Sequence, residues 1–325
     1  MEYAVLGDTG MTTSRICLGC YSFGGGTEWM LDEAASAEII EHAIDRGITF
    51  FDTANAYSGG NSERYLGNVL AEYDTDRMVV GTKVCFQMDE DNPNSKGLSR
   101  KALEQEVAAS RDRLGLDTLD LLSIHRWDYD TPIEETLRTL DDMVRRNEVR
   151  YVGGSSMWAH QFAEAIYKAD ALGLERFATM QNHYNLAYRE EEREMLPLCA
   201  KEGIGVTPWS PLARGYLARP HEEMSATTRG ETDEHVDNRV EVYEHGAVCE
   251  INERVQELAA EKGVAMAQIA LAWLLHKDWV DAPIVGTTSV EHVDAAVEAL
   301  DISLSASEMA YLEEPYVPVP ITAHE

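Results

Sequence analysis

Short apolar runs alternate with amphipathic segments along most of the chain. The runs are rich in branched and aromatic residues and are followed by glycine or polar residues, which is typical of buried parallel strands. Eight such strands are predicted, at residues 16–20, 48–52, 78–83, 119–125, 149–153, 177–181, 204–209 and 283–285. Residues 1–14, with a turn signal at residues 6–10, predict a hairpin ahead of them.

Between the strands, apolar residues recur with the helical period. The predicted helices are 34–46, 64–72, 100–114, 133–146, 161–172, 190–202, 251–262 and 266–275. Several are followed by a glycine that suits a helix C-cap, at Gly47, Gly115, Gly173, Gly203 and Gly263. This alternation predicts an α/β fold, a (β/α)8 TIM barrel, with residues 1–325 as a single domain. A doubly wound sheet is the alternative, but no strand-linked G-x-G-x-x-G motif supports it.

Two intervals break the alternation. Residues 218–248 are polar and acidic with little apolar periodicity, and residues 87–97 form a shorter acidic stretch. We expect both to be long loops at the C-terminal face of the barrel, where loops of this length are usually functional.

Charge is the most unusual global property. The chain has 27 basic and 58 acidic residues, a formal net charge of -31. Such a surface repels nucleic acid and anionic membranes, so neither is expected as a partner. Only seven residues are lysines, and this composition favours a halophilic protein whose self-repulsion is screened by salt. No apolar stretch approaches the ~20 residues of a membrane span and no secretory signal is visible, so a cytoplasmic location is expected.

The five cysteines do not predict a disulfide framework, since their number is odd and most lie far apart. Cys17 and Cys20 have the spacing of a redox or metal pair. Residues three apart on a strand face opposite sides, so we expect them neither to form a bridge nor to share a ligand.

Four polar residues lie at or just beyond the ends of predicted strands: Asp52, Tyr57, Lys83 and His125. Barrel enzymes collect reactive groups at that end. A tyrosine titrates near pH ~10, and a nearby ammonium would lower its pKa while a buried carboxylate held that ammonium charged. A neutral imidazole could orient a carbonyl oxygen. Such a set could protonate an oxyanion as it forms, which carbonyl reduction requires when hydride comes from a cofactor.

Each residue also has a simpler interpretation. Asp52 could cap a strand end, Tyr57 could open a turn, Lys83 could be solvated and His125 could be a satisfied core residue. Their joint placement favours a site, because lysine and aspartate are rarely buried without a partner.

With these residues placed on a barrel, the chain resembles the aldo-keto reductase family over nearly its whole length. The matching motifs are Phe51-Asp52-Thr53-Ala54 with Tyr57, Gly81-Thr82-Lys83, His125-Arg126, Val149-Arg150-Tyr151-Val152-Gly153, Gln181-Asn182 with Tyr184-Asn185, and Trp209-Ser210-Pro211-Leu212. The later loops look most like the branch that includes potassium-channel β subunits and bacterial sugar or aldehyde reductases.

The resemblance implies an NAD(P)H-dependent oxidoreductase that reduces aldehydes or ketones, sugars among them, to alcohols. Tyr57 would be the general acid, Lys83 would depress its pKa, Asp52 would anchor Lys83, and His125 would orient the substrate carbonyl.

The family holds its nicotinamide cofactor in extended form at the strand C-termini. By resemblance, Ser155 and Gln181 would hold the carboxamide and Trp209 would lie against the nicotinamide ring. Ser210, Pro211, Leu212 and Arg214 would line the pyrophosphate, and Cys20, Tyr21, Asp52 and Gly286 are further candidate contacts. Taken alone, Ser155 and Gln181 could instead satisfy strand-end backbone, and Trp209 could be a core aromatic residue.

The adenosine end departs from the family pattern. A basic or amide residue is usual near Thr288 or His292, and no lysine or arginine follows Asp278. Residues 286–289 could present hydroxyls and helix N-terminal amides to a phosphate. The 2'-phosphate of NADP would then need Arg219 or Arg229 from the long loop, or a protonated His292. We expect NADP rather than NAD on family precedent. Ser156 stands where asparagine is common, without an expected effect on the chemistry.

Other functions stay open. One is a nicotinamide-binding redox sensor with little turnover, as the channel-associated branch suggests. Metal-dependent hydrolysis is disfavoured because neither H-x-H nor H-E-x-x-H spacing occurs, and no metal site is predicted. The expected partner is a small-molecule carbonyl substrate, and a homo-oligomer is compatible with the sequence. Tyr21, Trp127 and Trp158 could form an aromatic substrate pocket or simply pack.

Overall fold

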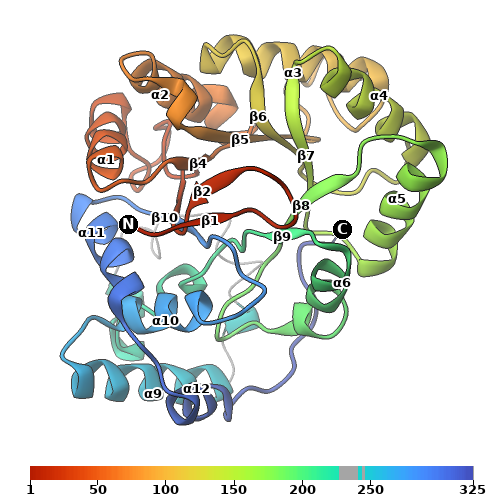
Figure 1. Cartoon of the computed structure of the whole chain (residues 1–325). Helices are drawn as coiled ribbons and strands as arrows, with labels where there is room; N and C mark the ends of the chain where they lie inside the picture. The colour runs from red at the N-terminus through yellow and green to blue at the C-terminus, as the bar shows by residue number, and fades with distance from the viewer. Residues whose placement is uncertain (227–240, 244–245, 325) are drawn as a thin grey trace.

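Eight parallel strands form a single curled sheet in the computed structural model, which describes residues 1–226, 241–243 and 246–324 (Figure 1). The strands are β3 (Cys17–Gly19), β4 (Phe50–Asp52), β5 (Val79–Val84), β6 (Leu119–Ile124), β7 (Val149–Ser155), β8 (Phe177–Gln181), β9 (Gly205–Val206) and β10 (Ile284–Gly286). β10 pairs with β3, and the Ile284 amide donates to the Pro208 carbonyl at 2.9 Å just beyond β9. These contacts close the ring, and the predicted (β/α)8 barrel is confirmed.

Helices surround the sheet (Figure 1). They are α1 (Glu33–Asp45), α2 (Asn61–Leu70), α3 (Arg100–Leu114), α4 (Ile133–Arg145), α5 (Ala159–Leu172), α6 (Met195–Glu202), α9 (Gly246–Lys262), α10 (Met266–Leu275), α11 (Val290–Glu298) and α12 (Ala306–Glu313). α3, α5 and α6 end at glycines in the left-handed conformation, as predicted for Gly115, Gly173 and Gly203.

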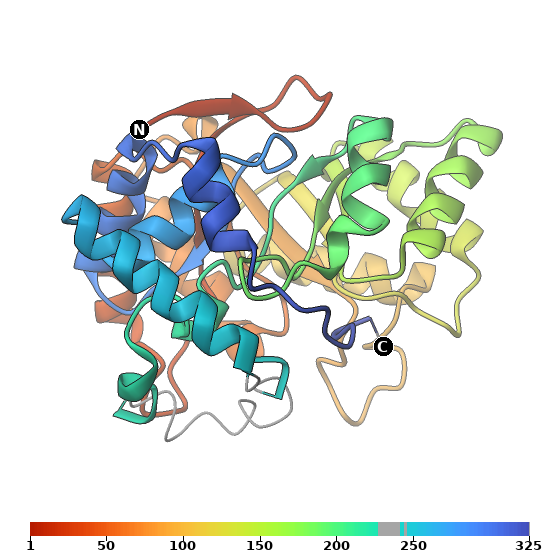
Figure 2. The ribbon, with the colours of Figure 1, turned by 90° about the horizontal axis from the view of Figure 1, so that it is seen from below.

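An antiparallel hairpin, β1 (Tyr3–Val5) and β2 (Thr12–Ser14), precedes the barrel as predicted. Leu6 and Met11 from its turn pack against Cys17, Phe50 and the other residues that begin the barrel strands. Gly7, with φ +55°, permits this approach, because a side chain there would meet the Gly205 nitrogen at 2.4 Å. The hairpin therefore plugs the N-terminal end of the barrel, and the C-terminal tail lies at the opposite end (Figure 2).

Two predicted segments differ from the structure, and two helices were missed. The helix predicted over 190–202 is a 3-10 turn, η3 (Glu190–Glu192), followed by α6, since Pro197 cannot donate within a continuous helix and falls instead in a first turn. The long loop predicted over 218–248 ends early, because α9 begins at Gly246; its described part holds the 3-10 turns η5 (His221–Ala226) and η6 (Glu241–Tyr243), and residues 227–240 and 244–245 lie outside the described residues. α11 and α12 were not predicted.

All five cysteines are free, so the Cys17–Cys20 spacing does not mark a disulfide. Among the described residues, no three or more His, Cys, Asp or Glu side chains are arranged to hold a metal ion. No single helix in the described ranges is long and apolar enough to cross a membrane; α9 and α10 meet that requirement only as a pair bent by 99°.

Candidate active site

Lys83 is the centre of a buried polar cluster at the C-terminal end of the barrel. Its Nζ lies 2.7 Å from Asp52 Oδ2, 2.8 Å from the Thr53 carbonyl oxygen and 3.2 Å from the Tyr57 hydroxyl. Lys83 is fully buried and Asp52 is 6% exposed, whereas Tyr57 is half-buried. The lysine is therefore held charged by a carboxylate, and its third contact is the hydroxyl of the half-buried Tyr57.

The strand register explains this placement. Asp52 pairs with Gly81 between β4 and β5, so Lys83 lies two residues further along β5 on the same face of the sheet. Tyr57 begins a 3-10 turn, η1 (Tyr57–Gly60), just beyond β4, which turns its ring back over the strand ends. Two neighbouring strands thus supply the carboxylate of Asp52 and the ammonium of Lys83, and one short loop supplies the phenol of Tyr57.

The pKa of Tyr57 is shifted upward, whereas the sequence predicted that Lys83 would lower it. Burial raises the pKa of Tyr57 above its usual value, and Lys83 lowers it only in part. Burial lowers the pKa of Lys83, but Asp52 and Tyr57 together raise it above its usual value. Lys83 thus acts on Tyr57 in the predicted direction without a net depression, so the phenol stays protonated and the ammonium stays charged at neutral pH.

Gln181 joins the cluster in a way that sequence reasoning missed. Its Nε2 donates to Asp52 Oδ1 at 2.8 Å, while Lys83 takes Oδ2, so both oxygens of the carboxylate are engaged. Gln181 ends β8, across the barrel from β4. The predicted carboxamide ligand therefore also orients Asp52.

Aromatic rings surround the Tyr57 phenol. Tyr21 meets it edge-on at 4.9 Å between ring centroids, and the His125 ring lies 5.7 Å away on a nearly perpendicular plane. Phe86, 40% exposed and not singled out by the sequence, lies 4.7 Å from His125. Of the predicted pocket residues, Tyr21 contacts Tyr57; Trp127 packs against the core, and Trp158 lies 4.9 Å from His324.

The predicted nicotinamide platform, Trp209, follows β9 and is held at one edge and on one face. Its indole Nε1 donates to Ser156 Oγ at 2.9 Å, and its ring stacks on His183 at 4.2 Å with 10° between planes. Ser155, buried at the end of β7, lies 3.3 Å from Ser156 between hydroxyls. Ser156, for which no effect was expected, therefore orients the predicted platform.

The segment after Trp209 has an unusual backbone. Ser210 and Arg214 have φ of 53° and 56°, values that favour glycine, and Arg214 lies in the 3-10 turn η4 (Ala213–Gly215). Pro211 is buried, whereas Leu212 and Arg214 are half-buried. The Cys20 thiol is buried and its pKa is raised by that burial, while its backbone amide donates to the Asp52 carbonyl at 2.8 Å.

In the region predicted to bind the adenosine end of the cofactor, Arg219 lies close enough to His292 for its charge to act on the imidazole. The pKa of His292 is lowered, first by burial and then by the Arg219 charge, which disfavours the protonated imidazole that was one of the three predicted alternatives. Gly286, the last residue of β10, and Thr288, which follows it before α11, are both exposed. The Arg219 Nε is buried without a hydrogen-bond partner among the described residues. Arg229 lies outside the described residues.

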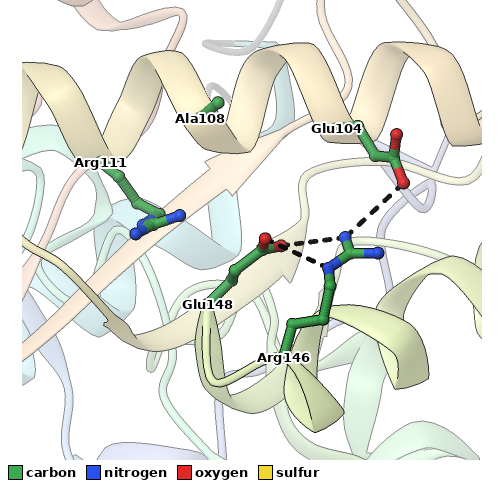
Figure 3. A pocket seen from close by; sticks show the side chains of 5 residues that line it. All are labelled: Glu104, Ala108, Arg111, Arg146 and Glu148. Atoms are coloured by element: carbon green, nitrogen blue, oxygen red, sulfur yellow. Dashed lines mark hydrogen bonds and ion pairs between the residues drawn. The ribbon is translucent and has the colours of Figure 1, made fainter.

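Two surface hollows elsewhere do not belong to this cluster. One of about 280 Å³ lies between α3 and the turn into β7, where Arg146 pairs with Glu104 at 3.6 Å and Glu148 at 3.0 Å (Figure 3). Glu148 immediately precedes β7, so this hollow is near the strand end opposite Tyr57. The other, of about 790 Å³, extends along α3 to Asn94 and Glu135.

Comparison with known proteins decides the family. The model of the aldo/keto reductase family matches residues 15–316, which include all eight barrel strands. The chain belongs to the aldo-keto reductase family. It is therefore an oxidoreductase of a family that typically uses NAD(P)H and acts on small-molecule carbonyl compounds.

The aldo-keto reductases most similar in sequence include several fungal proteins. Versiconal hemiacetal acetate reductase of Aspergillus parasiticus is 42% identical over 98% of each chain. A protein of Schizosaccharomyces pombe, provisionally named an aryl-alcohol dehydrogenase, is 41% identical over 98% of this chain and 97% of its own. The aldo-keto reductase AMT2 of Alternaria alternata is 39% identical over 99% and 93%.

Proposed function

We propose that this aldo-keto reductase uses NADPH to reduce aldehydes or ketones, aromatic ones in particular, with Tyr57 as the general acid. The observation that carries the proposal is the 3.2 Å contact between Lys83 Nζ and the Tyr57 hydroxyl, with Lys83 anchored by Asp52. The rings of Tyr21 and His125 lie beside the Tyr57 ring, and Phe86 lies beside His125, an aromatic surrounding that suits an aromatic substrate. The name of one relative refers to an aryl alcohol, which supports the same substrate class.

The bound cofactor would supply hydride to the carbonyl carbon. As the carbon–oxygen π pair moves onto oxygen, the Tyr57 hydroxyl gives its proton to that oxygen, and the product is the alcohol. The phenolate left behind is stabilised by the Lys83 ammonium until it takes a proton from solvent. His125 would hydrogen-bond the carbonyl oxygen and hold it within reach of Tyr57.

The residues present fit a nicotinamide cofactor. One face of Trp209 is covered by His183 while the residue as a whole stays half-buried, which leaves indole surface for a ring. At the adenosine end of the cofactor, the Arg219 Nε lies beside His292 and has no hydrogen-bond partner among the described residues, which suits the 2'-phosphate of NADP. Because the lowered pKa keeps His292 neutral, Arg219 would supply the positive charge that pairs with this phosphate. These features favour NADP over NAD.

A panel of benzaldehydes and aliphatic aldehydes with NADPH, followed by the absorbance of the reduced cofactor, tests the function. Steady turnover, faster with the aromatic members, supports the reductase. One slow turnover per subunit would instead support the redox sensor. Arg219→Ala should raise the KM for NADPH and leave that for NADH nearly unchanged. Equal catalytic efficiency of the two cofactors with the unaltered protein would contradict the NADP preference.

A further inference from the structure

Trp209 is backed by a buried aromatic stack. The ring of His183 lies between those of Trp209, at 4.2 Å, and Tyr188, at 3.9 Å, and the planes differ by 10° and 13°. His183 is 4% exposed and Tyr188 is fully buried. The Trp209 amide also donates to the Asn182 carbonyl at 2.8 Å. The orientation of the indole therefore depends on the ring beneath it.

Tyr243 holds this stack from a distant segment. It ends η6 and is 1% exposed, and its hydroxyl makes a short hydrogen bond with His183 Nε2. The same hydroxyl accepts from Asn185 Nδ2 at 3.1 Å. Burial raises the pKa of Tyr243, so the group stays a hydroxyl that can donate to one partner and accept from the other.

The Asn185 side-chain amide connects Tyr243 to Ser210, one of the residues expected to contact the cofactor. Its Nδ2 also donates to the Ser210 carbonyl at 2.9 Å, where the Ser210 backbone has the uncommon φ of 53°. The Tyr243 hydroxyl is therefore bonded both to His183, the ring that backs Trp209, and to Asn185, the amide that holds Ser210. Trp209 and Ser210 are the residues expected at the nicotinamide and the pyrophosphate.

We propose that Tyr243 is a positioning residue for the cofactor: its hydroxyl fixes the His183–Trp209 stack and the Ser210 backbone together. This inference rests on the proposed function, because it takes Trp209 and Ser210 as cofactor contacts. In this proposal Tyr243 acts through His183 and Asn185, so loss of its hydroxyl affects how tightly the cofactor binds rather than the proton transfer at Tyr57.

Tyr243→Phe keeps the ring and removes only the hydroxyl. Loss of one or two buried hydrogen bonds should raise the Kd for NADPH, measured by quenching of tryptophan fluorescence, about tenfold. The KM for NADPH should rise with it, and kcat should change less than about twofold. The matched control is Tyr188→Phe. It removes a phenol hydroxyl beside the same histidine, but that hydroxyl accepts a hydrogen bond from the Thr322 amide instead of bonding His183. Its Kd should stay within about twofold of the wild type.

His183→Phe provides an independent variant, because it keeps an aromatic ring under Trp209 but loses the bond to Tyr243. The double variant, His183→Phe with Tyr243→Phe, should have a Kd for NADPH no higher than that of the single variant that binds more weakly, since each substitution removes the same hydrogen bond. A Kd within twofold of the wild type in Tyr243→Phe, or fully additive losses, would overturn the proposal. If the unaltered protein bound neither NADPH nor NADH, the proposed function itself would fail and this inference with it.

Discussion

The Lys83 ammonium lies 3.2 Å from the Tyr57 hydroxyl and has no exposure of its own. Because Asp52 neutralises the lysine at 2.7 Å, the positive charge can persist in the barrel interior without solvent. The arrangement stabilises negative charge on Tyr57 at the moment when it gives up its proton, even though burial keeps the phenol protonated at rest.

The raised pKa of Tyr57 sets the pH range of reduction. Tyr57 must be protonated to act as acid, so activity is retained below its pKa and lost as the pH rises through it. Since that pKa lies above the usual ~10, kcat/KM for reduction should stay level from pH 7 to about 9 and decline only at higher pH. A decline centred below pH 9, with the fold intact by circular dichroism, would contradict this assignment.

Asp52→Asn removes the charge that holds Lys83. A buried ammonium without its carboxylate should cost the fold about 3 kcal/mol, measured by urea unfolding, and reduction should slow as well. The matched control is Asp142→Asn, whose carboxylate also pairs at 2.7 Å, with Arg100, but with both side chains more than 40% exposed. It should cost at most about 1 kcal/mol. Equal losses in the two variants would show that burial of the pair adds nothing.

The Lys83 pair also predicts a pH dependence of stability. The folded pKa of Lys83 is raised, so its stabilising contribution is complete below the unfolded value near ~10.4 and is lost as the pH rises through the folded pKa. The Lys83 contribution to the free energy of unfolding of the wild type should therefore be constant through neutral pH, and urea unfolding of the wild type between about pH 6 and 9 measures it. In Asp52→Asn, burial is no longer opposed by the carboxylate, so the pKa of Lys83 should fall and the stability of the variant should change at a lower pH than that of the wild type. The same pH dependence in both proteins would contradict the role of Asp52.

The hairpin plug should matter for stability and not for chemistry. Leu6 is fully buried among the first residues of the barrel strands, so Leu6→Ala should lower the free energy of unfolding by about 2–5 kcal/mol. Val5→Ala, at a 48% exposed neighbour, should have little effect. Both variants should keep the wild-type kcat at a temperature where they are folded, whereas a fall in kcat for Leu6→Ala there would link the two ends of the barrel.

Net charge predicts a dependence on salt. With a formal charge of -31, self-repulsion at low ionic strength should lower the Tm, and added KCl should raise it progressively. Thermal melts between about 0.05 and 3 M KCl measure this directly. An unchanged Tm, with full activity after dialysis into low salt, would remove the case for adaptation to a salty environment.

Most of the barrel could be predicted because each strand is a single apolar run in the sequence and because apolar residues recur at helical spacing in most of the helices. The S-x-x-E sequence from Ser305 to Glu308, which forms a capping box at the start of α12, is a local signal that could have predicted that helix. The reactive cluster was also predictable, since Asp52, Lys83 and Tyr57 lie within or just beyond adjacent strands.

The remaining features depend on contacts between distant segments. His183 gains its place from Trp209, Tyr188 and Tyr243, the last of them 60 residues away, and no periodic pattern encodes such a meeting. The net direction of the Tyr57 pKa likewise depends on how much burial opposes Lys83, which needs coordinates. Burial of one group and its distance from another are properties of the folded chain.

Replacement of Tyr57 by Phe tests the central claim most directly, since it removes the hydroxyl beside Lys83 and leaves the proposed cofactor contacts in place. The proposal predicts that kcat for aldehyde reduction falls by about 10²–10⁴-fold while the Kd for NADPH stays within about twofold of the wild type. A variant that still reduced aldehydes at the wild-type rate would contradict the assignment of Tyr57 as the proton donor.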